Sequence, residues 1–301
     1  MLTSLFGKAT GLFDKRFILG LLLPCLAFIG AILALIAIAY GWSAALGHWR
    51  QLSGGEQALA ALAVLATVTF AALLLGIQLP TLTRFWEGYW YGPAGRRCAA
   101  AGRRLQLRRR RRLDPSDPRD DMRRYYEFPV DPGRILPTRL GNVLRAAESY
   151  PGDEERYGVD AVFFWPRLYL VLPDQCRLAL AEARASMEQM LVVTTLLAAA
   201  APIAALIGLT GPLPLAIWTS TTVGCLLSAL LSYRSAVGAA ITFGDLVRAA
   251  FDLYRRDLLR QLGLAPPETL GEERALWKAV SQQLYRRGAD QPELLRFERP
   301  R

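Results

Sequence analysis

Residues Phe17–Tyr40 have the sequence FILGLLLPCLAFIGAILALIAIAY, which contains no Asp, Glu, Lys or Arg. A helix crosses the hydrocarbon core of a bilayer with about 20 such residues. Three further stretches meet the same criterion: Ala58–Leu79, Met190–Leu209 and Leu213–Ser232. The sequence therefore predicts an all-α integral membrane protein with four transmembrane helices.

The composition agrees with this class. A mean hydropathy of +0.21 coexists with 36 Lys and Arg residues, because apolar and basic residues are segregated along the chain. The first apolar run is well beyond the usual length of the apolar region of a signal peptide, and three more spans follow, so we expect it to be retained. The shorter stretch Ala161–Pro173 carries Arg167 and Pro166, and we interpret it as a buried or interfacial segment.

Basic residues at the ends of the spans predict the orientation, since Lys and Arg hold loops in the cytoplasm. Lys15 and Arg16 precede the first span, an arginine run follows the second, and Arg234 follows the fourth. We expect a multi-pass protein of the inner (plasma) membrane with both termini in the cytoplasm. Only Gly41–Gln57 and a short turn before Leu213 remain for the outside.

This topology divides the chain into five parts, the second and fourth of which are transmembrane helical hairpins. The parts are an interfacial amphipathic helix (1–16), hairpin one (17–79), a cytoplasmic basic segment with a mostly helical middle domain (80–189), hairpin two (190–232) and cytoplasmic C-terminal helices (233–301).

Local signals predict further helix boundaries. Thr138 is an expected N-cap of a helix that ends near Glu148. We expect Asp174–Glu188 to run without a break into the third span, and the fourth span to continue beyond Arg234 until Pro266-Pro267. A last amphipathic helix is expected at about Thr269–Arg287. A helix break is expected at Gln78-Leu79-Pro80, and a linker at Asp114–Pro118.

The sequence contains no motif that indicates catalysis. Phosphate-binding glycine loops, His-Glu-x-x-His, Cys-x-x-Cys and Gly-x-Ser-x-Gly are all missing. Two of the four cysteines lie in spans and two in the expected cytoplasmic parts, so no disulfide framework is implied. We expect no enzyme activity and no cofactor.

The arginine run after the second span has two interpretations. Clustered cations bind nucleic acids, but they also bind anionic lipid headgroups, at about 1 kcal/mol for each charge near the inner leaflet. We favour anionic lipids, because the run lies close to a span end and has no interleaved aromatic residues. The candidate lipid contacts are Arg103, Arg104, Arg108, Arg109, Arg110, Arg111 and Arg112.

One face of the fourth span is small and hydroxylated. Its members, spaced by three or four residues, are Thr221, Gly224, Ser228, Ser232 and Ser235. Such a face permits close helix packing, or it can line a hydrated pore. We favour packing, since pairs of small residues also occur in other spans, at Gly30/Ala34 and Ala204/Gly208.

The end of the second span carries an aromatic cluster beside Arg84. A pore mouth would use the charge of Arg84 and narrow the path with Phe85 and Trp86. A structural anchor would place the same aromatic rings among lipid headgroups, and we favour this reading. Candidate pore or interface residues are Gln78, Arg84, Phe85, Trp86, Thr221 and Ser228.

Two resemblances follow from these residues. The stretches Pro137–Asn142 and Tyr157–Arg167 resemble an uncharacterised family of bacterial membrane proteins, which implies a bacterial source and no particular activity. The four-span layout and Thr83-Arg84-Phe85-Trp86 are similar to bestrophin anion channels, which would imply a pentameric pore lined by the second span. An aromatic constriction and an acidic calcium-binding cluster like those of bestrophins are not found in the expected places.

The leading hypothesis is a homo-oligomeric membrane channel or pore for an unspecified ion. The alternative is a membrane-tethered scaffold or signalling protein whose cytoplasmic domain binds a protein partner. The two hypotheses differ in whether a continuous hydrated path crosses the membrane.

Overall fold

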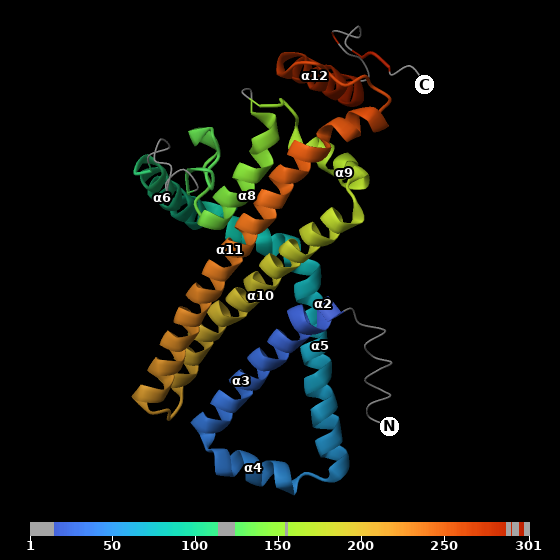
Figure 1. The fold of residues 1–301 in the computed structure, drawn as a ribbon. Coiled ribbons are helices and arrows are strands. Elements are labelled where there is room, and N and C mark those ends of the chain that lie inside the picture. The colour runs from blue at the N-terminus through green and yellow to red at the C-terminus, as the bar shows by residue number, and fades with distance from the viewer. Residues whose placement is uncertain (1–14, 114–123, 154–155, 287–289, 291–294, 298–301) are drawn as a thin grey trace. The chain divides into compact units, whose positions relative to one another are not determined.

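The computed structural model describes residues 15–113, 124–153, 156–286, 290 and 295–297, and these are almost entirely helical (Figure 1). Short helical turns occur at α2 (Lys15–Phe17), η1 (Ile18–Leu22), η2 (Pro132–Arg134) and η3 (Tyr150–Gly152). The longer helices are α3 (Leu23–Tyr40), α4 (Trp42–Gln51), α5 (Gly54–Glu87), α6 (Gly92–Arg111), α8 (Arg139–Ser149), α9 (Ala161–Val171), α10 (Asp174–Thr210), α11 (Leu215–Gln261) and α12 (Leu270–Arg286). Within the described residues there is one isolated β-bridge, between Leu264 and Phe297.

Among the described residues, four helices are long and apolar enough to span a membrane. They comprise Ile18–Tyr40, Gly54–Glu87, Asp174–Thr210 and Leu215–Gln261. The predicted class of membrane protein with four transmembrane helices is therefore supported by helix length and composition. The last three helices extend well beyond their apolar stretches, and the predicted continuity of Asp174–Glu188 with the third span is confirmed.

The predicted helix break at Gln78-Leu79-Pro80 is wrong, because α5 continues through Pro80 to Glu87. Proline removes one backbone N–H, which would otherwise bond to the carbonyl of Gly76. Breaking the helix would free several more polar groups in an apolar environment that offers them no partner. Losing one hydrogen bond is the smaller cost, so the helix persists.

The end of α11 also differs from the prediction, since the helix stops at Gln261 and not at Pro266-Pro267. Gly263 adopts a left-handed conformation with φ of +74°. The N–H of Gly263 donates to the carbonyl of Arg260, and that of Leu264 donates to Leu259. This glycine cap satisfies the terminal carbonyls before the prolines are reached.

The chain forms two compact units, which divide within the continuous helices α5, α10 and α11. We call Met1–Thr83 with Ala185–Ala236 the apolar unit, and Arg84–Arg184 with Val237–Arg301 the polar unit. The predicted interfacial helix 1–16 falls almost wholly outside the described residues, as does the predicted linker Asp114–Pro118.

The apolar unit contains two small clusters of buried side chains. One joins α3 and α5 through Cys25, Val68 and Ala72, with Leu196 of α10 packed against it. The other joins α3 and α10 through Leu35, Ala39 and Ala204. Many other apolar side chains of these helices are exposed, as expected of surfaces that meet lipid or further protein.

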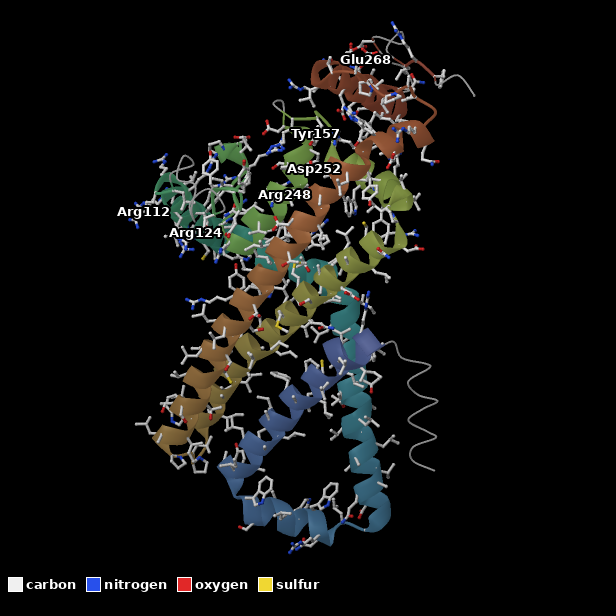
Figure 2. All side chains as sticks on the ribbon, viewed as in Figure 1. Arg112, Arg124, Tyr157, Arg248, Asp252 and Glu268 are labelled. Carbon is white, nitrogen blue, oxygen red and sulfur yellow. The ribbon has the colours of Figure 1, made fainter. Side chains whose placement is uncertain are left out.

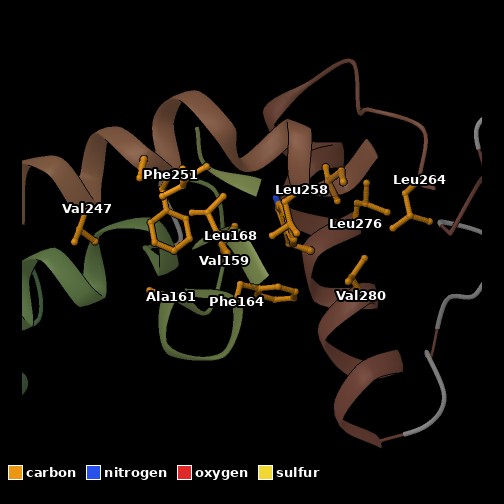
Figure 3. Packing of buried hydrophobic residues seen from close by; sticks show 14 of the residues in the cluster. Val159, Ala161, Phe164, Leu168, Val247, Phe251, Leu258, Leu264, Leu276 and Val280 are labelled. Atoms are coloured by element: carbon orange, nitrogen blue, oxygen red, sulfur yellow. The ribbon is translucent and has the colours of Figure 1, made fainter. Parts of the chain in front are cut away.

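The polar unit has a larger hydrophobic core built by α9, α10, α11 and α12 (Figure 3). Phe164 and Trp277 are fully buried and meet edge to face, with ring centroids 4.9 Å apart. Ala161, Phe164 and Leu168 of α9 are buried whereas Val162 and Leu170 are exposed, so the stretch interpreted as a buried or interfacial segment buries one face. The final amphipathic helix, predicted at Thr269–Arg287, is confirmed as α12.

Helix α8 begins as the sequence predicts. The side chain of Thr138 caps it by accepting a hydrogen bond of 3.0 Å from the N–H of Gly141. Leu140, Val143 and Ala147 then face inward and are buried. The cap and the apolar stripe together specify where the helix starts and which face it buries.

Candidate functional site

The aromatic cluster at the end of α5 makes a compact turn. The rings of Phe85 and Trp86 meet edge to face with centroids 5.6 Å apart. Nε1 of Trp90 donates a hydrogen bond of 2.8 Å to the carbonyl oxygen of Phe85. Gly88 turns the chain with φ of +100° and lies so close to Pro137 that a Cβ atom there would be 2.3 Å from the proline ring. The cluster therefore ties together the chain that follows α5.

The end of α5 is also bonded to α8. The hydroxyl of Thr138 donates to the carbonyl oxygen of Glu87 at 2.8 Å, and Gly141 packs directly on that carbonyl. Nη2 of Arg145 donates to the hydroxyl of Tyr89 at 2.7 Å. These contacts make the aromatic segment a structural joint of the polar unit.

The four candidate mouth residues on α5 do not share one face. Successive helical residues turn by about 100°, so Arg84, Phe85 and Trp86 point in three directions. Gln78 and Phe85 are both exposed. The helix therefore does not gather Arg84, Phe85 and Trp86 on one side.

The predicted lipid-contact arginines of α6 separate into two groups. Arg103 donates from Nε to the carbonyl of Ile135 at 2.7 Å and from Nη2 to that of Gly133 at 3.0 Å. Arg110 donates from Nη2 to the carbonyl of Val130 at 2.6 Å and to the hydroxyl of Tyr125 at 3.0 Å. These two arginines hold the segment that precedes α8. The remaining predicted members are exposed: Arg104, Arg108, Arg109, Arg111 and Arg112.

The hydroxyl face of α11 is partly satisfied within the chain. Thr221 donates to the carbonyl of Ile217 at 2.8 Å, and Ser232 reaches across to the carbonyl of Met190 on α10 at 2.9 Å. Ser235 bonds within its own helix. Ser228 is exposed, and a Cβ atom added to Gly224 would meet no atom within 4 Å.

The pairs of small residues have different surroundings. Ala204 is buried, and a Cβ atom on Gly208 would lie 2.2 Å from the ring of Trp218. This pair therefore allows α10 and α11 to pack closely inside one chain. A Cβ atom at Gly224 or Gly30 would meet no atom within 4 Å, so neither glycine packs closely against another helix in the described chain.

The structure also assembles a polar cluster that the sequence did not indicate. Tyr150 and Tyr157 donate to the two carboxylate oxygens of Asp252, at 3.0 and 2.9 Å. Figure 2 labels Tyr157 and Asp252. Burial, followed by the hydrogen bond to Asp252, raises the pKa of Tyr150 to about 12 and also raises the pKa of Tyr157. Both oxygens of Asp252 are occupied by internal donors, so the cluster is a structural element.

A buried ion pair lies beside this cluster. Nε of Arg255 is 2.7 Å from Oε1 of Glu273, whose side chain has no exposed surface. The guanidinium of Arg255 also stacks 3.7 Å from the ring centre of Tyr157. No periodic sequence pattern could have revealed either cluster, because the partners lie far apart along the chain.

A surface hollow of the polar unit is lined by Tyr126, Glu127, Val143, Ile241, Asp245 and Arg248. Its charged groups are already paired, Glu127 with Arg139 and Asp245 with Arg248. In the part of the chain that is described, no group of His, Cys, Asp or Glu is placed to hold a metal ion.

Comparison of the whole sequence with protein-family models, with curated proteins and with solved structures gives no match.

Proposed function

We propose that the protein is a homo-oligomeric membrane pore in which neighbouring copies meet through the exposed part of the hydroxyl face of α11, at Gly224 and Ser228. The observation that carries this proposal is the contrast between two small-residue pairs. The space beside Gly208 is occupied by the ring of Trp218 within the chain, whereas a Cβ atom at Gly224 would meet no atom within 4 Å and Ser228 is exposed. Small, hydroxylated faces favour contact with another helix at close range.

The apolar unit supports the oligomer in a second way. Val223, Leu226 and Leu230, on the opposite side of α11, are also exposed, but their aliphatic side chains suit lipid. A serine hydroxyl in hydrocarbon gains from a protein or water partner. The hydroxyl face is therefore the side of α11 that we assign to neighbouring copies and to a hydrated path between them.

The contacts among the aromatic side chains at the end of α5 favour a structural role for Phe85 and Trp86 in this pore. Arg84 lies on a different face of α5 from Phe85, and its side chain is exposed. In a conducting preparation, Arg84→Glu should leave the anion-to-cation preference unchanged. Ser228→Asp, which adds a charge to the α11 face, should shift that preference toward cations.

The oligomer is tested with Gly224→Leu, using Val223→Leu as the matched control. A Cβ atom at residue 224 would meet no atom within 4 Å in the single chain, and the residue is exposed, so the variant should fold normally. It should nevertheless reduce the number of subunits in each particle, measured as particle mass in lipid nanodiscs. It should also abolish conductance in planar bilayers. Val223→Leu should change neither.

A monomeric parent protein would contradict the pore proposal. An intact oligomer without conductance would instead support the second candidate, a membrane-tethered scaffold that binds a protein partner. The separate hydrophobic core of the polar unit favours that candidate, because the unit has the means to fold as a binding domain.

A further inference from the structure

Helix α6 has one face that is used to hold the polar unit together. A Cβ atom on Gly102 would lie 2.8 Å from the carbonyl oxygen of Pro137, so the helix backbone approaches this segment closely. Gln106 is buried with 5% exposure, and Arg103 and Arg110 on the same side donate to backbone carbonyls. This face fixes the rotation of α6 about its own axis within the polar unit.

The opposite face presents a stripe of four exposed arginines. Arg97, Arg104, Arg108 and Arg111 follow one another at separations of seven, four and three residues. At about 100° per residue, these separations place all four within roughly 60° of the helix circumference. The stripe is about 21 Å long, given the helical rise of about 1.5 Å per residue. The sequence analysis did not include Arg97, because it precedes the dense arginine run that begins at Arg103, although its helical spacing could have revealed it.

Nothing on α6 neutralises these charges. The stretch Gly92–Leu113 contains no Asp or Glu. Arg104 and Arg108 are four residues apart, and Arg108 and Arg111 three, which are separations at which like charges destabilise a helix. An anionic partner along the stripe would remove this repulsion.

The position of α6 in the sequence favours lipid as that partner. Only Gly88–Tyr91 separates α6 from α5, one of the four helices able to span a membrane. Clusters of four to eight basic residues next to a transmembrane helix are typical binding sites for anionic lipid headgroups. Single-stranded nucleic acid binds to grooves that also carry aromatic rings for base stacking, and this stripe carries none.

We propose that Arg97, Arg104, Arg108 and Arg111 form a docking surface for anionic phospholipid headgroups, while Arg103 and Arg110 have a structural role. In this proposal only the arginines on one face of α6 bind lipid headgroups. If the total charge of the helix mattered instead, every exposed arginine would contribute equally. This surface does not depend on the pore, since it requires only that α5 be membrane-embedded.

The test compares two triple variants with the same loss of charge. Arg104/Arg108/Arg111→Gln removes three members of the stripe. Arg96/Arg109/Arg112→Gln removes three exposed arginines from other directions around the helix. Full-length protein is reconstituted in phosphatidylcholine with a minor fraction of phosphatidylglycerol, and the ratio of the two lipids retained by the purified protein is measured by mass spectrometry.

The parent protein should be enriched in phosphatidylglycerol, and the enrichment should fall as salt is raised. In the stripe variant, the enrichment in phosphatidylglycerol should fall by a factor of about five or more. A factor of about five is expected for the loss of a single headgroup contact. The control variant should stay within about twofold of the parent. Circular dichroism should show unchanged helix content in both.

Equal losses in the two variants would overturn the assignment to one face, and no loss in either would overturn the lipid contact. Binding of a fluorescent single-stranded RNA in detergent, lost only in the stripe variant and without any lipid preference, would assign the surface to nucleic acid instead. Oligomer mass and conductance are separate readouts, so failure of the pore proposal would not be mistaken for failure of this one.

Discussion

The hydroxyl of Tyr157 donates a hydrogen bond of 2.9 Å to Oδ1 of Asp252, although 95 residues separate them in the sequence. Tyr150 donates to the other oxygen of the same carboxylate. Asp252 therefore connects α11 to η3 and to the segment that precedes α9. A substitution at Asp252 therefore tests how much these hydrogen bonds contribute to the stability of the polar unit.

Asp252→Ala should destabilise the polar unit by about 1–3 kcal/mol, because two partly buried tyrosine hydroxyls lose their acceptor. The measurement is chemical unfolding of the full-length protein in detergent, followed by tryptophan fluorescence. Leu253→Ala is the control, since Leu253 is next in the chain and is 69% exposed. Equal effects of the two substitutions would contradict the structural role of the carboxylate.

The raised pKa of Tyr150 predicts loss of stability in alkali. Its pKa is about 12 in the folded state and about 10 in an unfolded chain. The stabilisation is therefore complete below about pH 10 and is lost as the pH rises from there toward 12. Tyrosinate absorbance, recorded as the difference between the parent and Tyr150→Phe, should show a midpoint near 12. A midpoint near 10 would contradict the burial and the hydrogen bond.

Glu273→Ala should be among the most damaging substitutions in α12. The carboxylate is fully buried against Arg255, and removing one partner of a buried ion pair costs about 3–5 kcal/mol. Lys278→Ala, on the exposed side of the same helix, should cost little. Both are measured by the same unfolding assay, and a cost below about 1 kcal/mol for Glu273→Ala would show that the pair is dispensable.

Two glycines of the apolar unit should respond in opposite ways to the same change. Gly208→Ala forces a methyl group against Trp218 and should destabilise the chain by about 1–3 kcal/mol. Gly224→Ala meets no atom within 4 Å, and alanine is the better helix former, so the single chain should be unchanged or slightly more stable. Thermal unfolding of monomers in detergent distinguishes them, and a matching loss in both would refute the difference in packing.

The expected orientation can be tested with cysteine labelling in intact cells. Ser53→Cys lies in the exposed turn between α4 and α5 and should react with a membrane-impermeant maleimide from outside. The natural Cys98, exposed on α6, should react only after the cells are permeabilised. Labelling of the parent protein in intact cells would reverse the proposed topology.

Local features of the sequence determined the class of fold. Uncharged apolar runs predicted four long helices, Thr138 predicted the start of α8, and helical spacing predicted that α11 continues beyond Arg234, although not where it ends. Each of these signals acts within a few turns of one helix, so a single sequence displays it directly. The break at Pro80 failed as a prediction because the cost of a missing hydrogen bond must be compared with the cost of freeing an entire helix end.

Tertiary contacts decided what the sequence left open. Arg103 and Arg104 are adjacent, chemically identical and both exposed, yet only Arg103 of these two donates to backbone carbonyls 30 or more residues away in the described structure. Gly208 and Gly224 are likewise both small, but only Gly208 meets a tryptophan ring. The difference lies in which distant residues the fold brings within contact. Helical periodicity specifies the direction of a side chain from its own axis, whereas the group it meets depends on the packing of the other helices.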